Sequence, residues 1–150
     1  MILWRISNHA DLRGLGGVFR SGRWHHAGVP VVYLSESPAL ALLEVIANFD
    51  LAPTEFPDNY QLLEVDCGSV AALPLDDGQL PEEWTGHRAL TRRIGSQWLA
   101  SGASALLKVP SAVVARSWNY LLNPLHADAA YVIVRSSSRH PFDRRLTRGS

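Results

Sequence analysis

Cysteine is almost absent from this 150-residue sequence, and long apolar runs and any excess of one charge are missing. The lone Cys67 has no second thiol for an internal disulfide, so we expect a cytoplasmic protein. No run approaches the roughly 18 apolar residues that cross a bilayer, and the N-terminus lacks the charged-then-apolar order of a signal peptide. The sequence therefore does not predict a membrane protein.

The charges balance, because 14 Lys and Arg residues stand against 14 Asp and Glu residues. Surfaces that bind nucleic acid or membranes usually carry a basic excess. Direct nucleic-acid binding is therefore not expected. The length and the 47% apolar content suit one domain with a real core.

Motifs for metals, phosphate loops and serine nucleophiles are missing as well. His25 and His26 are adjacent, so on an extended backbone they point to opposite faces, and no HExxH or CxxC is present. The glycine-rich residues 14–17 follow no apolar strand and precede no Gly-Lys-Ser/Thr. The candidate serines lack the Gly-x-Ser-x-Gly elbow. We expect no metal site.

The most informative stretch is residues 22–47, GRWHHAGVPVVYLSESPALALLEVIA. It predicts a basic, aromatic turn, a strand over residues 29–34 and then a helix. Ser37 suits the N-cap of that helix, and Pro38 suits the first helical position, where its missing N–H costs nothing. The helix is apolar almost all round, which predicts that it is buried.

Glu44 is the one ionisable residue in this helix, on a narrow seam with Ala41 and Asn48. With Arg23 and Tyr33 it could form a site. Arg23 would bind a phosphate or carboxylate in bidentate fashion, Tyr33 would offer a flat aromatic face, and the charge of Glu44 would suit a cationic transition state. The same residues also fit a structural arrangement, in which Arg23 and Glu44 are a buried ion pair and Tyr33 is core. Composition alone slightly favours the structural arrangement.

The rest of the chain alternates short strands with one further helix. This pattern predicts a single α+β domain over residues 1–150, with a split or strongly bent mixed sheet flanked by helices. The expected elements are strands at 1–7, 60–66, 105–110 and 129–135, a helix at 81–101 stopped by Gly102, loops at 8–21, 51–59 and 119–126, and a weakly packed tail from about 136.

Four motifs in this order resemble the RES-domain family, the toxins of RES–Xre toxin–antitoxin pairs. They are GRWHHAGVPVVYLSESPALALLEV, LLKVPSAVV, NYLLNPLH and PFDRRL, and the similarity runs from Trp4 to about Leu146. By motif, the family's Arg, Glu and Ser fall on Arg23, Glu44 and Ser111, with the strand tyrosine at Tyr33. Arg5 is a rival for the arginine, and Ser117 is a weaker rival for the serine.

The resemblance implies an ADP-ribosyltransferase-like fold and a toxin that degrades NAD⁺, its substrate rather than a cofactor. In that chemistry Glu44 would stabilise an oxocarbenium-like state and hold the ribose, Arg23 would grip the pyrophosphate or orient the ribose, and Tyr33 would stack on nicotinamide. Ser111 would position the ribose or Glu44. Trp24, His25 and Asn123 are further candidates to line the cleft.

The acceptor stays open at this point, since water and inorganic phosphate are equally compatible with the sequence. Two other functions stay open too: ADP-ribosylation of a protein target, and a catalytically silent domain that only binds an antitoxin. The implied partner is a small Xre-like antitoxin with a helix-turn-helix, which would carry the DNA contacts itself.

Overall fold

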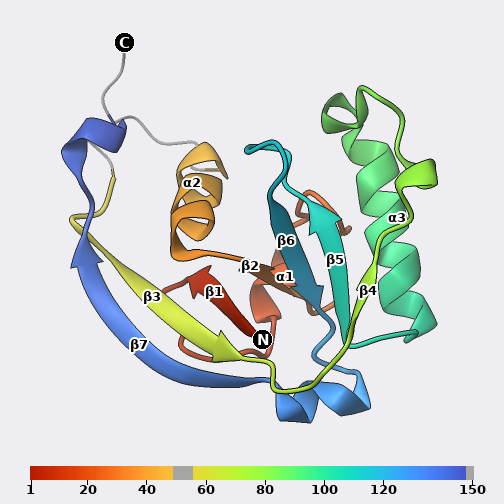
Figure 1. Cartoon of the computed structure of the whole chain (residues 1–150), viewed down its shortest axis with the longest axis horizontal. Helices are drawn as coiled ribbons and strands as arrows, with labels where there is room; N and C mark the ends of the chain where they lie inside the picture. Colours follow the sequence, from red (N-terminus) through yellow and green to blue (C-terminus); the bar gives the residue numbers. More distant parts are fainter. Residues whose placement is uncertain (49–55, 148–150) are drawn as a thin grey trace.

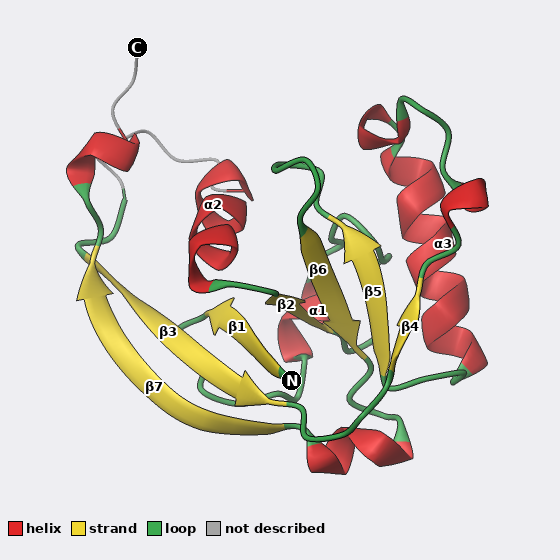
Figure 2. Cartoon of the chain, viewed as in Figure 1, coloured by secondary structure: helices red, strands yellow, loops and turns green. Residues whose placement is uncertain are grey.

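Seven strands form one mixed sheet within the residues that the computed structural model describes, 1–48 and 56–147 (Figures 1 and 2). The order is β4-β5-β6-β2-β1-β3-β7, and every neighbouring pair is antiparallel except β4 and β5. The strands are β1 Ile2–Ile6, β2 Val32–Ser35, β3 Asn59–Asp66, β4 Ala72–Pro74, β5 Leu106–Pro110, β6 Trp118–Leu122 and β7 Ile133–Pro141.

In the described part of the chain three α-helices accompany the sheet, together with short 3₁₀ turns. They are α1 Leu15–Phe19, α2 Pro38–Asn48 and α3 Arg88–Ser101, with 3₁₀ turns η2 Asp77–Gln79, η3 Trp84–Gly86, η4 Ala127–Tyr131 and η5 Arg144–Thr147. The α+β class and the bent mixed sheet are confirmed, and the sheet is continuous rather than split (Figure 1). No helix in the described part of the chain has the length and apolarity needed to cross a bilayer.

The central strands build two hydrophobic cores because their side chains alternate between the two faces of the sheet. On one face the even-numbered residues of β2, β5 and β6 cluster with residues of β1 and β3, including Val32, Leu34, Leu106, Leu122, Leu3 and Leu63. On the other face the odd-numbered strand residues, including Leu107, Val109 and Leu121, pack against Ile94 and Trp98 of α3. The second face also carries the polar residues of the cleft described below.

The predicted central helix is confirmed, with a difference in burial. Ser37 caps α2 as expected, since its Oγ accepts a hydrogen bond from the Leu40 N–H at 3.1 Å. Only Leu40 and Ala41 are buried, while Leu43 is 40% exposed. The helix therefore lies on the sheet by one face, against β1 and β2, instead of being enclosed.

Two segments that were not expected to be strands belong to strands. The loop expected at 119–126 contains most of β6, whose apolar residues are buried from both faces of a central strand and so show no alternation. The tail expected to be weakly packed from 136 continues β7, which pairs with β3 as far as Pro141. Its Arg, Ser and His side chains are exposed on an edge strand, so hydrophobic pattern gives no signal there.

Smaller differences concern where elements begin. The loop expected at 8–21 contains α1, and the strand expected from residue 29 starts at residue 32. The helix expected from residue 81 starts at Arg88, after the turn η3, while Gly102 ends it with φ 63° as expected. Most of the linker expected at 51–59 lies outside the described residues.

Gly95 sets how closely α3 approaches the turn that carries Trp24. A Cβ at Gly95 would lie 1.7 Å from the Trp24 carbonyl oxygen, a backbone atom that cannot swing away. A Cβ at Gly86 would meet nothing within 4 Å. The contact at Gly95 is therefore a steric requirement of the fold.

We expect Gly95→Ala to lower the free energy of unfolding by about 3 kcal/mol, since overpacking outweighs the gain in helix propensity. The matched Gly86→Ala should change it by less than about 0.5 kcal/mol. Urea unfolding followed by tryptophan fluorescence measures both. Equal stability of the two variants would contradict the packing described here.

Candidate active site

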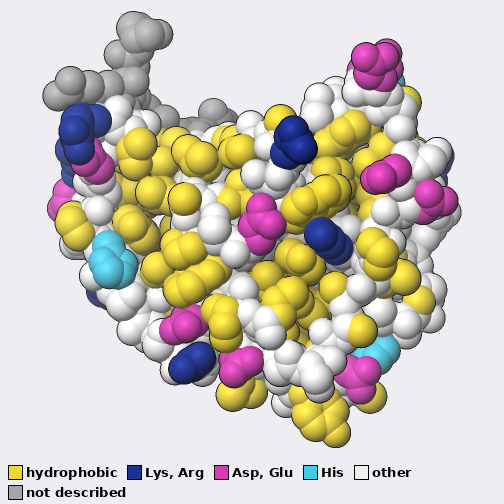
Figure 3. Space-filling view, in the orientation of Figure 1, with side chains coloured by type: hydrophobic (Ala, Val, Ile, Leu, Met, Phe, Trp, Pro, Cys, Tyr) yellow, Lys and Arg dark blue, Asp and Glu magenta, His cyan; other side chains and the backbone are white. Residues whose placement is uncertain are grey.

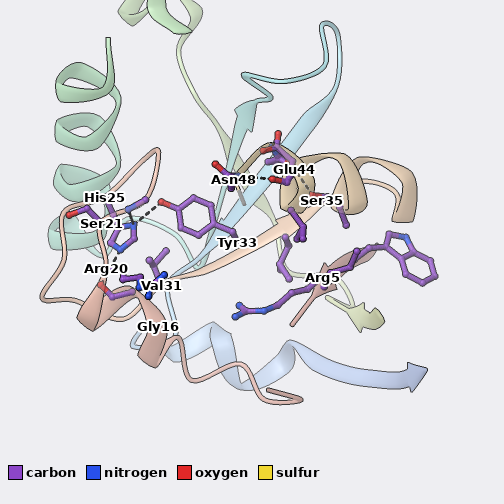
Figure 4. Close-up of a pocket in the computed structure, with 18 residues that line it drawn as sticks. Arg5, Gly16, Arg20, Ser21, His25, Val31, Tyr33, Ser35, Glu44 and Asn48 are labelled. Atoms are coloured by element: carbon purple, nitrogen blue, oxygen red, sulfur yellow. Dashed lines mark hydrogen bonds between the residues drawn. The ribbon is translucent and has the colours of Figure 1, made fainter. Parts of the chain in front are cut away.

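A cleft with two adjoining chambers lies against the strand β2 and the helix α2. Figure 4 shows the first of the two chambers. The chambers have volumes of about 440 Å³ and about 580 Å³. Both are lined by the same central residues: Arg20, Ser21, Gly22, Tyr33, Glu44, Asn48 and Asn119. Glu44 and Tyr33 thus lie where the two chambers meet.

Glu44 presents a partly buried carboxylate to this cleft with its two oxygens in different environments. Oε1 accepts hydrogen bonds from Ser111 Oγ at 2.6 Å and from Asn119 Nδ2 at 2.8 Å. Among the described residues, none donates a hydrogen bond to Oε2. One oxygen is therefore fixed by the protein, and the other is available to a ligand.

The ion pair considered as a structural alternative does not form between Arg23 and Glu44 in the described part of the chain. Arg23 Nη1 instead donates to the Thr85 carbonyl at 2.7 Å, and Arg23 lines the second chamber. Burial lowers the Arg23 pKa, and so does the neighbouring charge of Arg88, while the Glu44 carboxylate raises it. Arg23 and Glu44 interact across the cleft without contact.

The hydroxyl group of Ser111 is fully used in hydrogen bonds, one of which binds Glu44. Its Oγ accepts hydrogen bonds from the N–H groups of Val113 and Val114, at 3.1 and 3.0 Å. With both lone pairs used, its single hydroxyl proton points to Glu44. Its rival Ser117 contributes a backbone carbonyl that accepts from the Ser111 N–H at 2.8 Å. The structure thus places Ser111, rather than Ser117, beside the carboxylate.

Asn119 and Ser35 belong to the site although sequence reasoning missed them. Ser35 Oγ donates to Asn119 Oδ1 at 2.7 Å, and Asn119 in turn donates to Glu44. Both side chains are buried on central strands. The available signal was an asparagine inside the apolar run WNYLL, a polar residue that a buried strand tolerates only with partners.

Tyr33 and His25, which both line the first chamber, form a neutral hydrogen-bonded pair. His25 Nε2 lies 3.0 Å from the Gly17 carbonyl, which can only accept, so this nitrogen carries the proton. His25 Nδ1 then accepts from the Tyr33 hydroxyl at 2.7 Å, and that hydroxyl accepts from the Trp24 N–H at 3.1 Å. Burial raises the pKa of Tyr33 to about 12 and lowers the pKa of His25, so both are uncharged at neutral pH.

The cleft is locally basic although the chain is neutral. Arg5 and Arg20 line the first chamber, and Arg20, Arg23 and Arg88 line the second. In the orientation of Figure 1, the surface shows acidic and basic side chains scattered among hydrophobic ones (Figure 3). Since Glu44 is the sole carboxylate among the residues lining the two chambers, the cleft suits a ligand with negative charge.

Within the part of the chain that the structure describes, Arg5 combines burial with an unpaired guanidinium. It extends from β1 into the first chamber (Figure 4). In the described residues its guanidinium has neither a hydrogen bond nor an ion pair; burial lowers its pKa and Asp11 acts only at a distance. Arginine stays protonated at neutral pH regardless. Arg5, the rival to Arg23, thus brings an unpaired charge to the cleft.

The structure brings most of the predicted site residues together. Trp24 lines the second chamber and His25 the first, but both rings are buried, and the His25 nitrogens are already bonded. Asn123 is not at the cleft; its Oδ1 accepts from the Leu125 N–H at 3.1 Å and shapes the turn after β6. The described residues contain no group of three or more His, Cys, Asp or Glu that could hold a metal.

The neutral state of His25 gives a pH-dependence with a defined sign. Its pKa in the folded chain lies below the ordinary value of about 6.5, so the unfolded chain binds a proton first as pH falls. His25 therefore stabilises the fold fully above about pH 6.5 and loses that contribution as pH drops toward its folded pKa.

We expect imidazole ¹⁵N spectra of the folded protein to show His25 still neutral, with the proton on Nε2, at about pH 6.5, where an ordinary histidine is half protonated. The same ring in concentrated urea serves as the control and should titrate normally. A folded-state His25 that is half protonated at or above that pH would contradict the network.

The comparisons with known proteins agree with this architecture. The family model described as "RES domain" matches residues 2–145. "Toxin Res" of Pseudomonas putida is 46% identical over 86% of this chain and 88% of its own length. "Prs ADP-ribosylating toxin" of Sphingobium sp. is 35% identical over 97% of this chain and 96% of its own length.

A solved structure gives the same fold. The crystal structure of the M. tuberculosis MbcT-MbcA toxin-antitoxin complex matches with a TM-score of 0.71 and 18% identity, over 97% of this chain and 86% of that one. At that identity the match supports the fold, while the family model and the closer sequence relatives support membership. The chain belongs to the RES domain family of toxins.

Proposed function

We propose that this toxin breaks the bond between nicotinamide and ribose in NAD⁺. The observation that carries the proposal is Glu44, a carboxylate whose Oε1 is fixed by two donors while Oε2 is left to an arginine-lined cleft. NAD⁺ matches both features, since it joins an anionic pyrophosphate to a ribose that becomes cationic during cleavage.

In the proposed reaction the bond between the ribose C1′ and the nicotinamide nitrogen breaks, and the electron pair leaves with neutral nicotinamide. Positive charge then spreads over the ribose C1′ and ring oxygen, as in glycoside hydrolysis. Glu44 Oε2 would stabilise that charge and accept a hydrogen bond from the ribose hydroxyls. In hydrolysis the oxygen of water then bonds to C1′ and its proton passes to the solvent. In phosphorolysis an anionic oxygen of inorganic phosphate bonds to C1′ and no proton is released.

The remaining cleft residues would bind the ends of the substrate. Arg5 has an unpaired guanidinium for the pyrophosphate, and Arg23 would add charge from the second chamber. Tyr33, neutral and held by His25, would present its ring to the nicotinamide. This arrangement gives Ser111 a supporting role, because its hydroxyl is bound to Glu44.

Transfer of ADP-ribose to a protein is the second candidate, and one observation favours it. The Sphingobium relative, which is similar over nearly the whole chain, is named a Prs ADP-ribosylating toxin. The same cation at C1′ would then be captured by a protein side chain. Incubation of cell extract with radiolabelled NAD⁺ separates the two: labelled protein bands indicate transfer, and free nicotinamide without them indicates cleavage.

We also propose that a cognate antitoxin, of the Xre-like helix-turn-helix type, neutralises the toxin in the cytoplasm. The support is the matching fold of a toxin that was solved as a toxin-antitoxin complex. Covering the cleft would be the simplest means of inhibition. The antitoxin would then supply the DNA contacts, in keeping with the zero net charge of this chain.

Glu44→Gln keeps the size of the side chain and removes its charge. We expect nicotinamide release from NAD⁺ by the purified protein to fall by about 100-fold or more, since the charge acts on the transition state. The matched Glu82→Gln, at an exposed position outside the cleft, should retain the wild-type rate. Chromatography of the products measures both, and a Glu44→Gln variant with the wild-type rate would contradict the proposal.

Arg5→Ala tests the assignment of the pyrophosphate. Loss of a charge-assisted contact should raise KM for NAD⁺ by about 10-fold or more with a smaller change in kcat. Arg93→Ala removes an exposed arginine of α3 and should leave KM unchanged. If KM stayed the same in the Arg5 variant, the phosphates would have to bind elsewhere.

A further inference from the structure

We infer that Asn119, supported by Ser35, is the positioning residue that sets the orientation of the Glu44 carboxylate for the reaction. The inference rests on the proposed function only for the identity of that reaction. Its physical basis is a chain of two hydrogen bonds. Ser35 Oγ on β2 donates to Asn119 Oδ1 on β6 at 2.7 Å, and Asn119 Nδ2 donates to Glu44 Oε1 on α2 at 2.8 Å.

The sheet holds the two supporting residues in a fixed relation. Ser35 and Asn119 are directly opposite each other in the register of β2 and β6. Asn119 is also opposite Val109 of β5, so it is enclosed by strands on both sides. Ser111 follows β5 directly and contacts the same carboxylate oxygen. Glu44 is therefore held by one donor within a central strand, Asn119, and by a second, Ser111, at the end of its neighbour.

The hydrogen bonds of Asn119 allow one orientation of its amide. Ser35 donates to Oδ1, which leaves Nδ2 facing Glu44. The reversed amide would place its oxygen against the carboxylate, and neither of those two oxygens can donate. Asn119 and Ser35 are only 8% and 6% exposed, so solvent cannot readily repair that mismatch.

The burial of Ser35 and Asn119 on central strands indicates that they serve function more than they stabilise the fold. A buried polar pair on two central strands carries a desolvation cost that an apolar pair would not carry. The surrounding positions on the same face, such as Val109 and Leu121, are apolar and buried. The Asn119 amide therefore serves to orient Glu44. Because two donors bind Oε1, Oε2 is directed into the cleft.

Asn119→Asp tests the inference, because it has the same shape and replaces the donor by an acceptor. We expect kcat to fall by about 100-fold with KM changed by less than about 3-fold, since the misplaced carboxylate matters in the transition state. Ser35→Ala, which leaves the donor in place, should lower kcat by about 10-fold. The exposed Asn59→Asp is the matched control and should behave as wild type.

A double-mutant cycle separates positioning from a general structural role. If Asn119 acts through Glu44, then Asn119→Asp combined with Glu44→Gln should cost about as much as Glu44→Gln alone. A combined loss equal to the product of the two single losses would overturn the inference, as would a wild-type kcat in the Asn119 variant. Thermal unfolding checks that each variant is folded, and Ser35→Ala continues the test if the Asn119 variants are not.

Measuring growth arrest after induction distinguishes a failure of this inference from a failure of the proposed NAD⁺ cleavage. If wild type arrests growth but releases no nicotinamide, the NAD⁺ cleavage proposal fails. The role of Asn119 is then still decided in cells. Loss of arrest with Asn119→Asp and Glu44→Gln, but not with Asn59→Asp, supports it; full arrest with Asn119→Asp overturns it.

Discussion

Two short hydrogen bonds to a single oxygen of Glu44 are the constraint on which the account of this site depends. They come from Ser111, the residue after strand β5, and from Asn119 on the adjacent strand β6, and they reach across to the helix α2. A carboxylate in an apolar helix is costly to bury without partners. Here the partners satisfy one oxygen only, and the other faces a cleft lined by arginines.

The fold can be understood as the means of holding that carboxylate. Alternation along the central strands directs one set of residues into the core formed with β1 and β3 and the other set toward α3 and the cleft. Because Ser35 and Asn119 occupy this second face, polar groups of the site are anchored among buried apolar neighbours. Rigid strands then fix the geometry more tightly than loops could.

The sequence was informative where local chemistry decides the structure. The Ser37 cap, the Gly102 stop and the isolated Glu44 are local signals, and all three appear where they were expected. Most of strand β6, and β7 from residue 136 onward, were mistaken for irregular segments, because a fully buried strand and a polar edge strand both lack alternation.

The candidate site was predictable to a similar extent. The family resemblance assigned Glu44 and Ser111 to one site, and the structure shows them joined by a hydrogen bond. No sequence pattern says that Ser35 and Asn119 are opposite each other, since register is a tertiary property. Asn123 lies in a motif shared with the family and yet only shapes a turn. Proximity in a motif therefore does not establish proximity in the cleft.

A crystal structure with a non-cleavable carbocyclic analogue of NAD⁺ would test the central claim most directly. The account predicts the ribose hydroxyls within hydrogen-bond distance of Glu44 Oε2, with Oε1 still bound to Ser111 and Asn119 and the pyrophosphate at Arg5. An analogue bound away from Glu44, or a carboxylate turned so that both oxygens face the protein, would contradict it.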